Sequence, residues 1–266
     1  IFAILLLTQQ AFGLKNTKEL TLITERKEYS SQTSTVIIEN SLFRDINSTG
    51  LQGGALSIVK SSVTIKGCQF HSCLSSLGGA INIQLSDKKL RHEINIQDTE
   101  FKSCAATKNG GAILINNQAD NKTITISNCV FSENSANNGG AIHITNKYLL
   151  TIEGCTFDNN VARIKGASLY STFGTSSGNG SNDIFVLRGN NFTFEAEENQ
   201  TNVYIKNAKV SSASTASPTL QIGGCTFSSE SSVTIFKHLE IEEVLGYTNT
   251  AFANIIFDSC NCVKQE

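Results

Sequence analysis

Short apolar runs separated by Ser, Thr, Asn and Gly recur along most of the chain. Within a run the apolar residues fall at every second position, as in Val63 and Ile65 and again in Ile81 and Ile83. That period is typical of a β-strand with one buried face. The runs span only about three to five residues each. The pattern therefore predicts very short strands, none of which buries a face by itself.

Two phrases repeat in step with these runs. Gly-Gly-Ala followed by Leu or Ile returns every 25 to 32 residues, beginning at Gly53, Gly78, Gly110 and Gly139. An apolar strand followed by Cys, one residue and Phe ends at Phe70, Phe131, Phe157 and Phe227. We expect the same Phe slot to be filled elsewhere by Phe43, Phe101, Phe192 and Phe257. Repetition at this interval is typical of a solenoid.

The repeat predicts an all-β fold, a right-handed single-stranded parallel β-helix of about eight coils. Equivalent residues of successive coils would superpose at about 4.8 Å, Phe on Phe and Ile on Ile. Consecutive glycines fit a corner that needs a positive φ or a close approach to the next coil. The right hand follows from the rule for parallel crossovers. The alternative, a β-sandwich, gives no reason for Gly-Gly-Ala-Ile at these intervals.

The repeats also divide the chain. Residues 1–13, apolar and then small and polar, resemble a signal-peptide remnant. Residues 14–34 are expected to form an N-terminal cap that covers the open edge of the solenoid. The β-helix is expected over 35–262, with polar insertions near 173–182 and 211–218. Insertions in solenoids often form a binding surface, although solvated loops are the simpler alternative.

The chain resembles a known family in its combination of phrases. Gly-Gly-Ala-Ile is paired with Phe-x-x-Asn, as in Phe131 to Asn134 and Phe157 to Asn160. This pairing is similar to the repeat of chlamydial polymorphic outer membrane proteins and of pectin-lyase-like surface proteins of protists. The resemblance covers residues 36 to about 170 well and the rest loosely. It implies an exported β-helix used in adhesion.

The cysteines fall into two registers relative to the repeat Phe. Two residues before it lie Cys68, Cys129, Cys155 and Cys225. Three residues after it, in the slot of Asn in Phe-x-x-Asn, lie Cys73, Cys104 and Cys260. Cysteines in the same slot of adjacent coils come within disulfide range. Bridges between Cys73 and Cys104 and between Cys129 and Cys155 are therefore one prediction, and a ladder of buried free thiols is the other.

Charge and sequons bear on location. The chain has 21 basic and 23 acidic residues and a net charge of -2, which disfavours a nucleic-acid partner. A glycosylating, extracellular route is supported by N-x-S/T sequons at Asn47, Asn121, Asn179, Asn191 and Asn199. We expect a secreted or cell-surface glycoprotein whose partners are host or neighbouring surface proteins or glycans. The chain is alternatively part of a larger membrane-anchored protein.

Candidate catalytic residues are spread over different coils of the predicted solenoid. Glycoside hydrolysis needs two converging carboxylates, yet the candidates fall on different coils or slots: Glu133, Glu153, Asp158 and Asp183. Arg163-Ile164-Lys165 resembles a polygalacturonase tripeptide, without its companion motifs. No catalytic residue, metal or cofactor is predicted. The expected function is adhesion or surface structure, and the alternatives are a polysaccharide-active enzyme and a carbohydrate-binding module.

Overall fold

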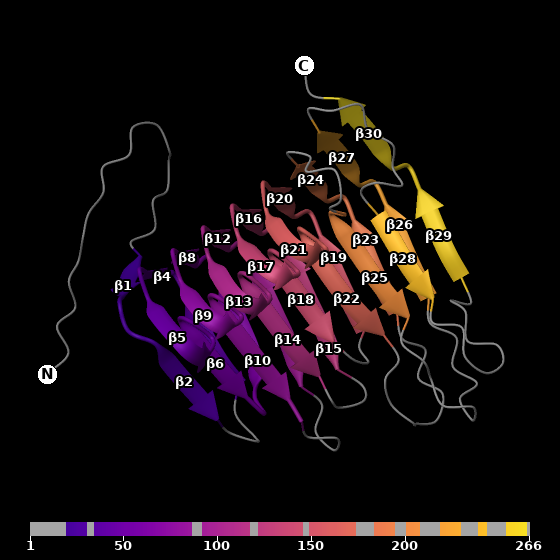
Figure 1. Cartoon of the computed structure of the whole chain (residues 1–266). Helices are drawn as coiled ribbons and strands as arrows, with labels where there is room; N and C mark the ends of the chain where they lie inside the picture. The colour runs from indigo at the N-terminus through magenta and orange to yellow at the C-terminus, as the bar shows by residue number, and fades with distance from the viewer. Residues whose placement is uncertain are drawn as a thin grey trace, which may run out of the picture.

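The chain forms four stacked, all-parallel sheets (Figure 1). The computed structural model describes residues 20–30, 35–86, 92–117, 122–145, 149–173, 184–194, 201–207, 219–229, 239–243 and 254–264. The predicted signal-peptide remnant, most of the first insertion and all of the second lie outside these residues.

Sheet A has nine strands and sheet C has eight. Sheet A contains β1 (Thr21–Ile23), β4 (Ser41–Arg44), β8 (Gln69–His71), β12 (Glu100–Lys102), β16 (Val130–Ser132), β20 (Thr156–Asp158), β24 (Asn191–Phe194), β27 (Thr226–Ser229) and β30 (Asn261–Lys264). Sheet C contains β3 (Thr35–Glu39), β7 (Ser62–Lys66), β11 (Glu93–Gln97), β15 (Thr123–Ser127), β19 (Leu149–Glu153), β23 (Ile184–Arg188), β26 (Thr219–Gly223) and β29 (Asn254–Asp258).

Sheets B and D complete the coils. Sheet B contains β2 (Lys27–Ser30), β6 (Leu56–Val59), β10 (Ile81–Leu85), β14 (Ile113–Asn117), β18 (Ile142–Thr145), β22 (Leu169–Phe173), β25 (Val203–Asn207) and β28 (Leu239–Glu243). Sheet D contains β5 (Asn47–Gln52), β9 (Leu74–Leu77), β13 (Ala105–Asn109), β17 (Ser135–Asn138) and β21 (Val161–Lys165). Among the described residues, sheet D therefore ends earlier than its neighbours.

Each complete coil runs through sheets C, A, D and B in that order and then begins the next coil in sheet C. The predicted right-handed parallel β-helix is confirmed. From the predicted N-terminal cap, the described residues 20–30 add β1 beside β4 and β2 beside β6. They lie at the N-terminal edge of sheets A and B (Figure 1).

A ladder of phenylalanines runs through the interior of sheet A. Neighbouring rings lie parallel, with centroids 4.6–5.0 Å apart and interplanar angles of 3–9°. The ladder consists of Phe43, Phe70, Phe101, Phe131, Phe157, Phe192 and Phe227, all buried. Aliphatic side chains of sheets B and C pack against it in columns of their own. The predicted stacking of Phe on Phe is thus confirmed for these seven residues.

The assignment of Phe257 to that ladder is wrong. Phe257 pairs with Ile222 in sheet C, and the residue beside Phe227 in sheet A is Cys262. The sequence is ambiguous here because residues of both inner columns lie three positions before a turn cysteine, as Ile222 does before Cys225. Phe257 occupies the aliphatic column of the last described coil and is 56% exposed there.

The glycine corner uses its two glycines differently. Gly110 adopts φ +67°, a left-handed conformation that costs a residue with a Cβ about 1–2 kcal/mol. At Gly111 the obstacle is steric, because an added Cβ would lie 1.9 Å from the carbonyl oxygen of Gly140 on the next coil. Both expected reasons for glycine are therefore confirmed: the positive φ at Gly110, where an added Cβ would also lie 2.3 Å from the carbonyl oxygen of Ile113, and the close approach to the next coil at Gly111.

Candidate functional site

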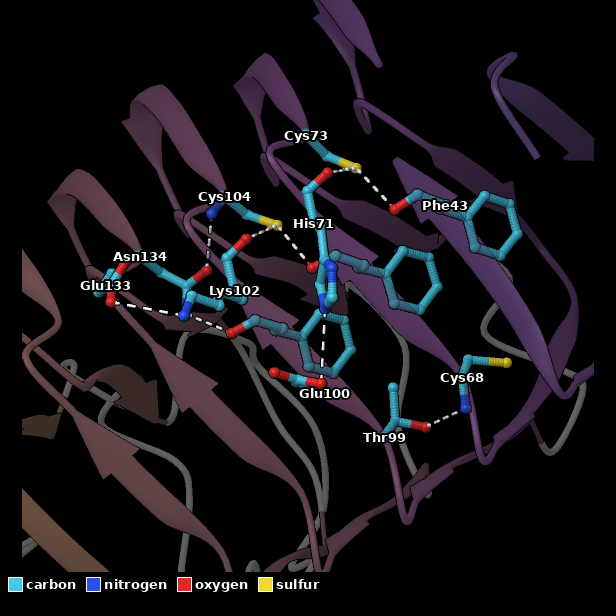
Figure 2. Close-up of polar contacts among 12 residues, drawn as sticks. Phe43, Cys68, His71, Cys73, Thr99, Glu100, Lys102, Cys104, Glu133 and Asn134 are labelled. Carbon is cyan, nitrogen blue, oxygen red and sulfur yellow. Dashed lines mark hydrogen bonds and ion pairs between the residues drawn. The ribbon is translucent and has the colours of Figure 1, made fainter. Parts of the chain in front are cut away.

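The two turn slots that flank the Phe ladder hold side chains that donate to the preceding coil. The Cys104 thiol donates to the carbonyl oxygen of Phe70 at 3.3 Å, and the Asn134 amide donates to that of Phe101 at 3.0 Å (Figure 2). Each side chain thus places its donor against a buried carbonyl oxygen of the preceding coil. This shared hydrogen bond explains why Cys and Asn replace one another at the position three residues after the repeat Phe.

The predicted cysteine pairs do occupy equivalent slots of adjacent coils. The structure holds Cys73, Cys104, Cys129 and Cys155 as buried free thiols, which is the ladder alternative. Burial, followed by the neighbouring Cys73, raises the pKa of the Cys104 thiol well above its ordinary value. The side chain of Cys155, followed by burial, does the same to the pKa of Cys129. The two bridges remain predictions for an oxidising compartment.

The assignment of Cys260 to the slot of Cys73 and Cys104 is wrong. In the register of sheets A and C it follows Cys225, since Ile222 pairs with Phe257 and Thr226 with Asn261. Its thiol donates to the carbonyl oxygen of Ile222 at 3.7 Å. The error follows directly from the misplacement of Phe257, because the predicted slot was counted from that residue.

The outer face of sheet A carries most of its charge near one column. Arg44, His71 and Lys102 lie side by side in the register of β4, β8 and β12. Two carboxylates lie close to these side chains: Glu100 lies 3.5 Å from His71, and Glu133 lies 3.7 Å from Lys102 (Figure 2). The hydrogen bond from His71 lowers the pKa of Glu100. These partly exposed pairs contribute little to stability.

On the outer face of sheet B, three rings follow one another along the solenoid, the first pair stacked and the second tilted by 33°. His143 lies 4.6 Å from Tyr170, and Tyr170 lies 4.8 Å from Tyr204, between centroids. Lys165 Nζ lies 4.2 Å from the centroid of the Tyr204 ring and 2.6 Å from Glu240 Oε1. Burial lowers the pKa of His143 to about 4. Sequence reasoning missed this cluster.

Lys165 is also the last residue of the Arg163-Ile164-Lys165 tripeptide. The tripeptide lies in β21, the last described strand of sheet D, and Arg163 is exposed there. In the structure Lys165 forms the ion pair with Glu240 that closes the cluster of rings. The side chain is therefore part of the contact between sheets D and B.

The outer face of sheet C carries most of its charge along one edge, in the column that contains Glu39, Lys66, Glu153, Arg188 and Asp258. Its outward residues alternate with the buried ones, which gives two further columns along the solenoid beside this edge. The first is Thr35, Ser62, Glu93, Thr123, Leu149, Ile184 and Thr219. The second is Ile37, Thr64, Asn95, Thr125, Thr151, Val186, Gln221 and Ile256. Glu93 is the only ionisable residue in these two columns.

Several aliphatic side chains are exposed on this face. Ile37 is 65% exposed, Leu149 is 42% exposed, and Ile184 and Ile256 are also exposed. Single exposed aliphatic residues are common, but together with the rows of threonine they give a surface on which Glu93 is the one charged side chain. We call these two columns of sheet C the uncharged face.

The carboxylates considered for hydrolysis are distributed over different elements. Glu133 lies in the turn after β16 and Asp158 in β20 of the next coil, linked by a backbone hydrogen bond of 2.9 Å. Glu153 ends β19 in sheet C. Asp183 lies outside the described residues. Within the described part of the chain, no three His, Cys, Asp or Glu side chains group as metal ligands would.

The structure describes two of the predicted glycosylation sites. Asn47 and Asn191 are both exposed, at the first positions of β5 and β24. The remaining sequons, at Asn121, Asn179 and Asn199, lie outside the described residues.

Comparisons with known proteins gave no match to a protein-family model, to a curated protein or to a solved structure. None of the described residues belongs to a helix long and apolar enough to span a membrane.

Proposed function

We propose that the chain is a non-catalytic secreted or cell-surface protein, a β-helical stalk that adheres to host or neighbouring surface molecules through the uncharged face of sheet C. The uncharged face is the observation that carries the proposal. The repeat phrases of the chain resemble those of polymorphic outer membrane proteins. This resemblance supports the same function, because that family uses such repeats in adhesion.

The physical argument concerns desolvation. Burying an ionised side chain at an interface costs several kcal/mol unless it is paired, whereas threonine, asparagine and aliphatic side chains cost far less. Strand pairing also holds the backbone beneath the face, so contact would order side chains but little main chain. A flat, pre-ordered surface with almost no charge suits contact with another extended surface, such as a glycan or a neighbouring protein.

A binding panel tests the proposal. The purified chain is applied to immobilised glycans and to intact cells, and release of reducing or unsaturated sugar is followed in the same wells. Retention without sugar release supports an adhesive stalk. Sugar release would overturn it in favour of a polysaccharide-active enzyme, and absence of retention on every surface would also count against it.

A matched pair of variants locates the contact. Thr151 lies on the uncharged face and Thr156 on the outer face of sheet A, and both are partly exposed residues of the same coil. We expect Thr151→Lys to weaken retention about tenfold or more, because the new charge must be desolvated. Thr156→Lys adds the same charge outside the proposed contact and should leave retention unchanged. Equal effects would move the contact away from sheet C.

The rings on sheet B favour a second candidate, a carbohydrate-binding module. Aromatic side chains beside a lysine and a carboxylate offer both apolar contact and hydrogen bonds. Tyr170 is the partly exposed member of the described stack. If Tyr170→Ala abolished glycan retention while Thr151→Lys did not, this candidate would replace the first.

A further inference from the structure

Asn47 lies in an edge strand that pairs with a described strand on one side only. It is the first residue of β5, the N-terminal edge strand of sheet D (Figure 1). In the preceding coil the chain passes directly from β1 to β2 through residues 24–26, without a strand in sheet D. The outer side of β5 therefore has no strand partner in the described part of the chain.

Only one end of that edge is covered by a described side chain. The Arg26 guanidinium donates from Nη2 to the carbonyl oxygen of Gln52 and from Nε to that of Gly53, both at 3.0 Å. The rest of β5 is largely exposed, including Leu51 at 51%. An open strand edge with an exposed aliphatic residue invites pairing with other chains unless something blocks it.

The side chain of Asn47 is arranged for modification. Its Oδ1 accepts hydrogen bonds from the backbone N–H of Thr49 at 3.1 Å and from the Thr49 hydroxyl at 2.5 Å. These two contacts fix the carbonyl side of the amide and leave Nδ2 without a hydrogen bond to any described residue. Gly50 follows with open space around the position of a Cβ. The two sequon residues that the modification requires, Asn47 and Thr49, are thus exposed, and their side chains are held in a defined position.

We propose that Asn47 carries an N-linked glycan that, together with Arg26, protects the open edge of sheet D from pairing with other strands. The inference rests on the proposed function, since it requires passage through a glycosylating export route. The donor would be an oligosaccharide linked to a lipid pyrophosphate. Asn47 Nδ2 loses one proton and bonds to the anomeric carbon, and the bond from that carbon to the pyrophosphate breaks, which releases the lipid pyrophosphate.

The site is tested by secretion of the full chain from a glycosylating host and mass analysis of the peptide that contains Asn47. We expect the glycan in the unaltered chain and in Thr49→Ser, which keeps the sequon, and its complete loss in Thr49→Ala. Thr49 is exposed, so neither change removes packing. An unmodified Asn47 in the unaltered secreted chain would overturn the proposal.

The protective role has its own readout. Enzymatic removal of the glycans from the folded protein should start concentration-dependent association, followed by light scattering, and Thr49→Ala should show it from the start. Asn191→Gln is the control, because Asn191 lies in β24 with strand partners β20 and β27 on both sides. Association equal in Thr49→Ala and Asn191→Gln would overturn protection of the edge by the Asn47 glycan.

The outcome is separable from that of the proposed function. Retention on the binding panel by the unaltered chain, secreted from the glycosylating host but unmodified at Asn47, would overturn this inference and leave adhesion standing. A glycan at Asn47 on a chain that binds nothing would support this inference and count against adhesion.

Discussion

The second glycine of the corner offers a sharp test of coil stacking. A Cβ at Gly111 would lie 1.9 Å from the carbonyl oxygen of Gly140, where real Cβ contacts are essentially never below 3.0 Å. Relief requires the coils to separate by about 1 Å or more, which would weaken ladder bonds such as the one from Gly111 N–H to Gly139 O at 3.0 Å. We expect Gly111→Ala to lower the free energy of unfolding by about 4 kcal/mol or more.

Two other glycines provide graded controls. Gly189 has φ +61° but no atom within 4 Å of an added Cβ, so Gly189→Ala should cost about 1–2 kcal/mol from backbone strain alone. Gly223 lacks a positive φ, and an added Cβ would meet its nearest atom at 3.5 Å, so Gly223→Ala should stay within about 1 kcal/mol of the unaltered chain. Urea unfolding followed by circular dichroism should give midpoints in this order. Equal midpoints for Gly111→Ala and Gly223→Ala would refute the stacking argument.

The remaining predictions concern the ladders. Phe131→Ala should cost about 4 kcal/mol of unfolding free energy, and the neighbouring exposed Val130→Ala less than about 1 kcal/mol; similar midpoints would contradict the buried ladder. Cys104→Asn should keep a donor for the carbonyl of Phe70, whereas Cys104→Ala should cost about 2 kcal/mol of unfolding free energy. A Cys104→Ala chain more stable than Cys104→Asn would exclude a hydrogen-bonding role for this slot. The pKa of His143 falls from 6.5 to about 4 on folding. Between these two pH values the imidazole is therefore protonated mainly in the unfolded chain. Stability should fall by about 3 kcal/mol between pH 6.5 and 4 through this group, and titration of His143→Leu should lack that part of the loss.

Much of the interior was predictable because each repeat carries its own local signals. Alternation at every second residue, as in Val63 and Ile65, predicts a half-buried strand wherever it occurs. Phe70 and Phe131 follow a cysteine at the same interval, so their positions in the stack follow from counting. The glycine pair adds a corner with one physical explanation for each residue.

The errors and omissions lie where a position has to be counted across coils of different length. Phe257 matches two inner slots equally well, and only its pairing with Ile222 decides between them. The rings of His143, Tyr170 and Tyr204 are separated by 27 and 34 residues, so insertions conceal their common register. The uncharged face was missed for the same reason, since its residues form columns only after every coil is aligned.

Distances along sheet C test the central claim, one continuous stack of coils, most directly. Spin labels would be introduced through a non-natural amino acid at Ile37 and at either Thr151 or Gln221, which lie four and six coils further along one column. At the spacing of paired strands, pulsed electron paramagnetic resonance should give about 19 Å for the first pair and about 29 Å for the second. A Gln221 pair no longer than the Thr151 pair would contradict the stack.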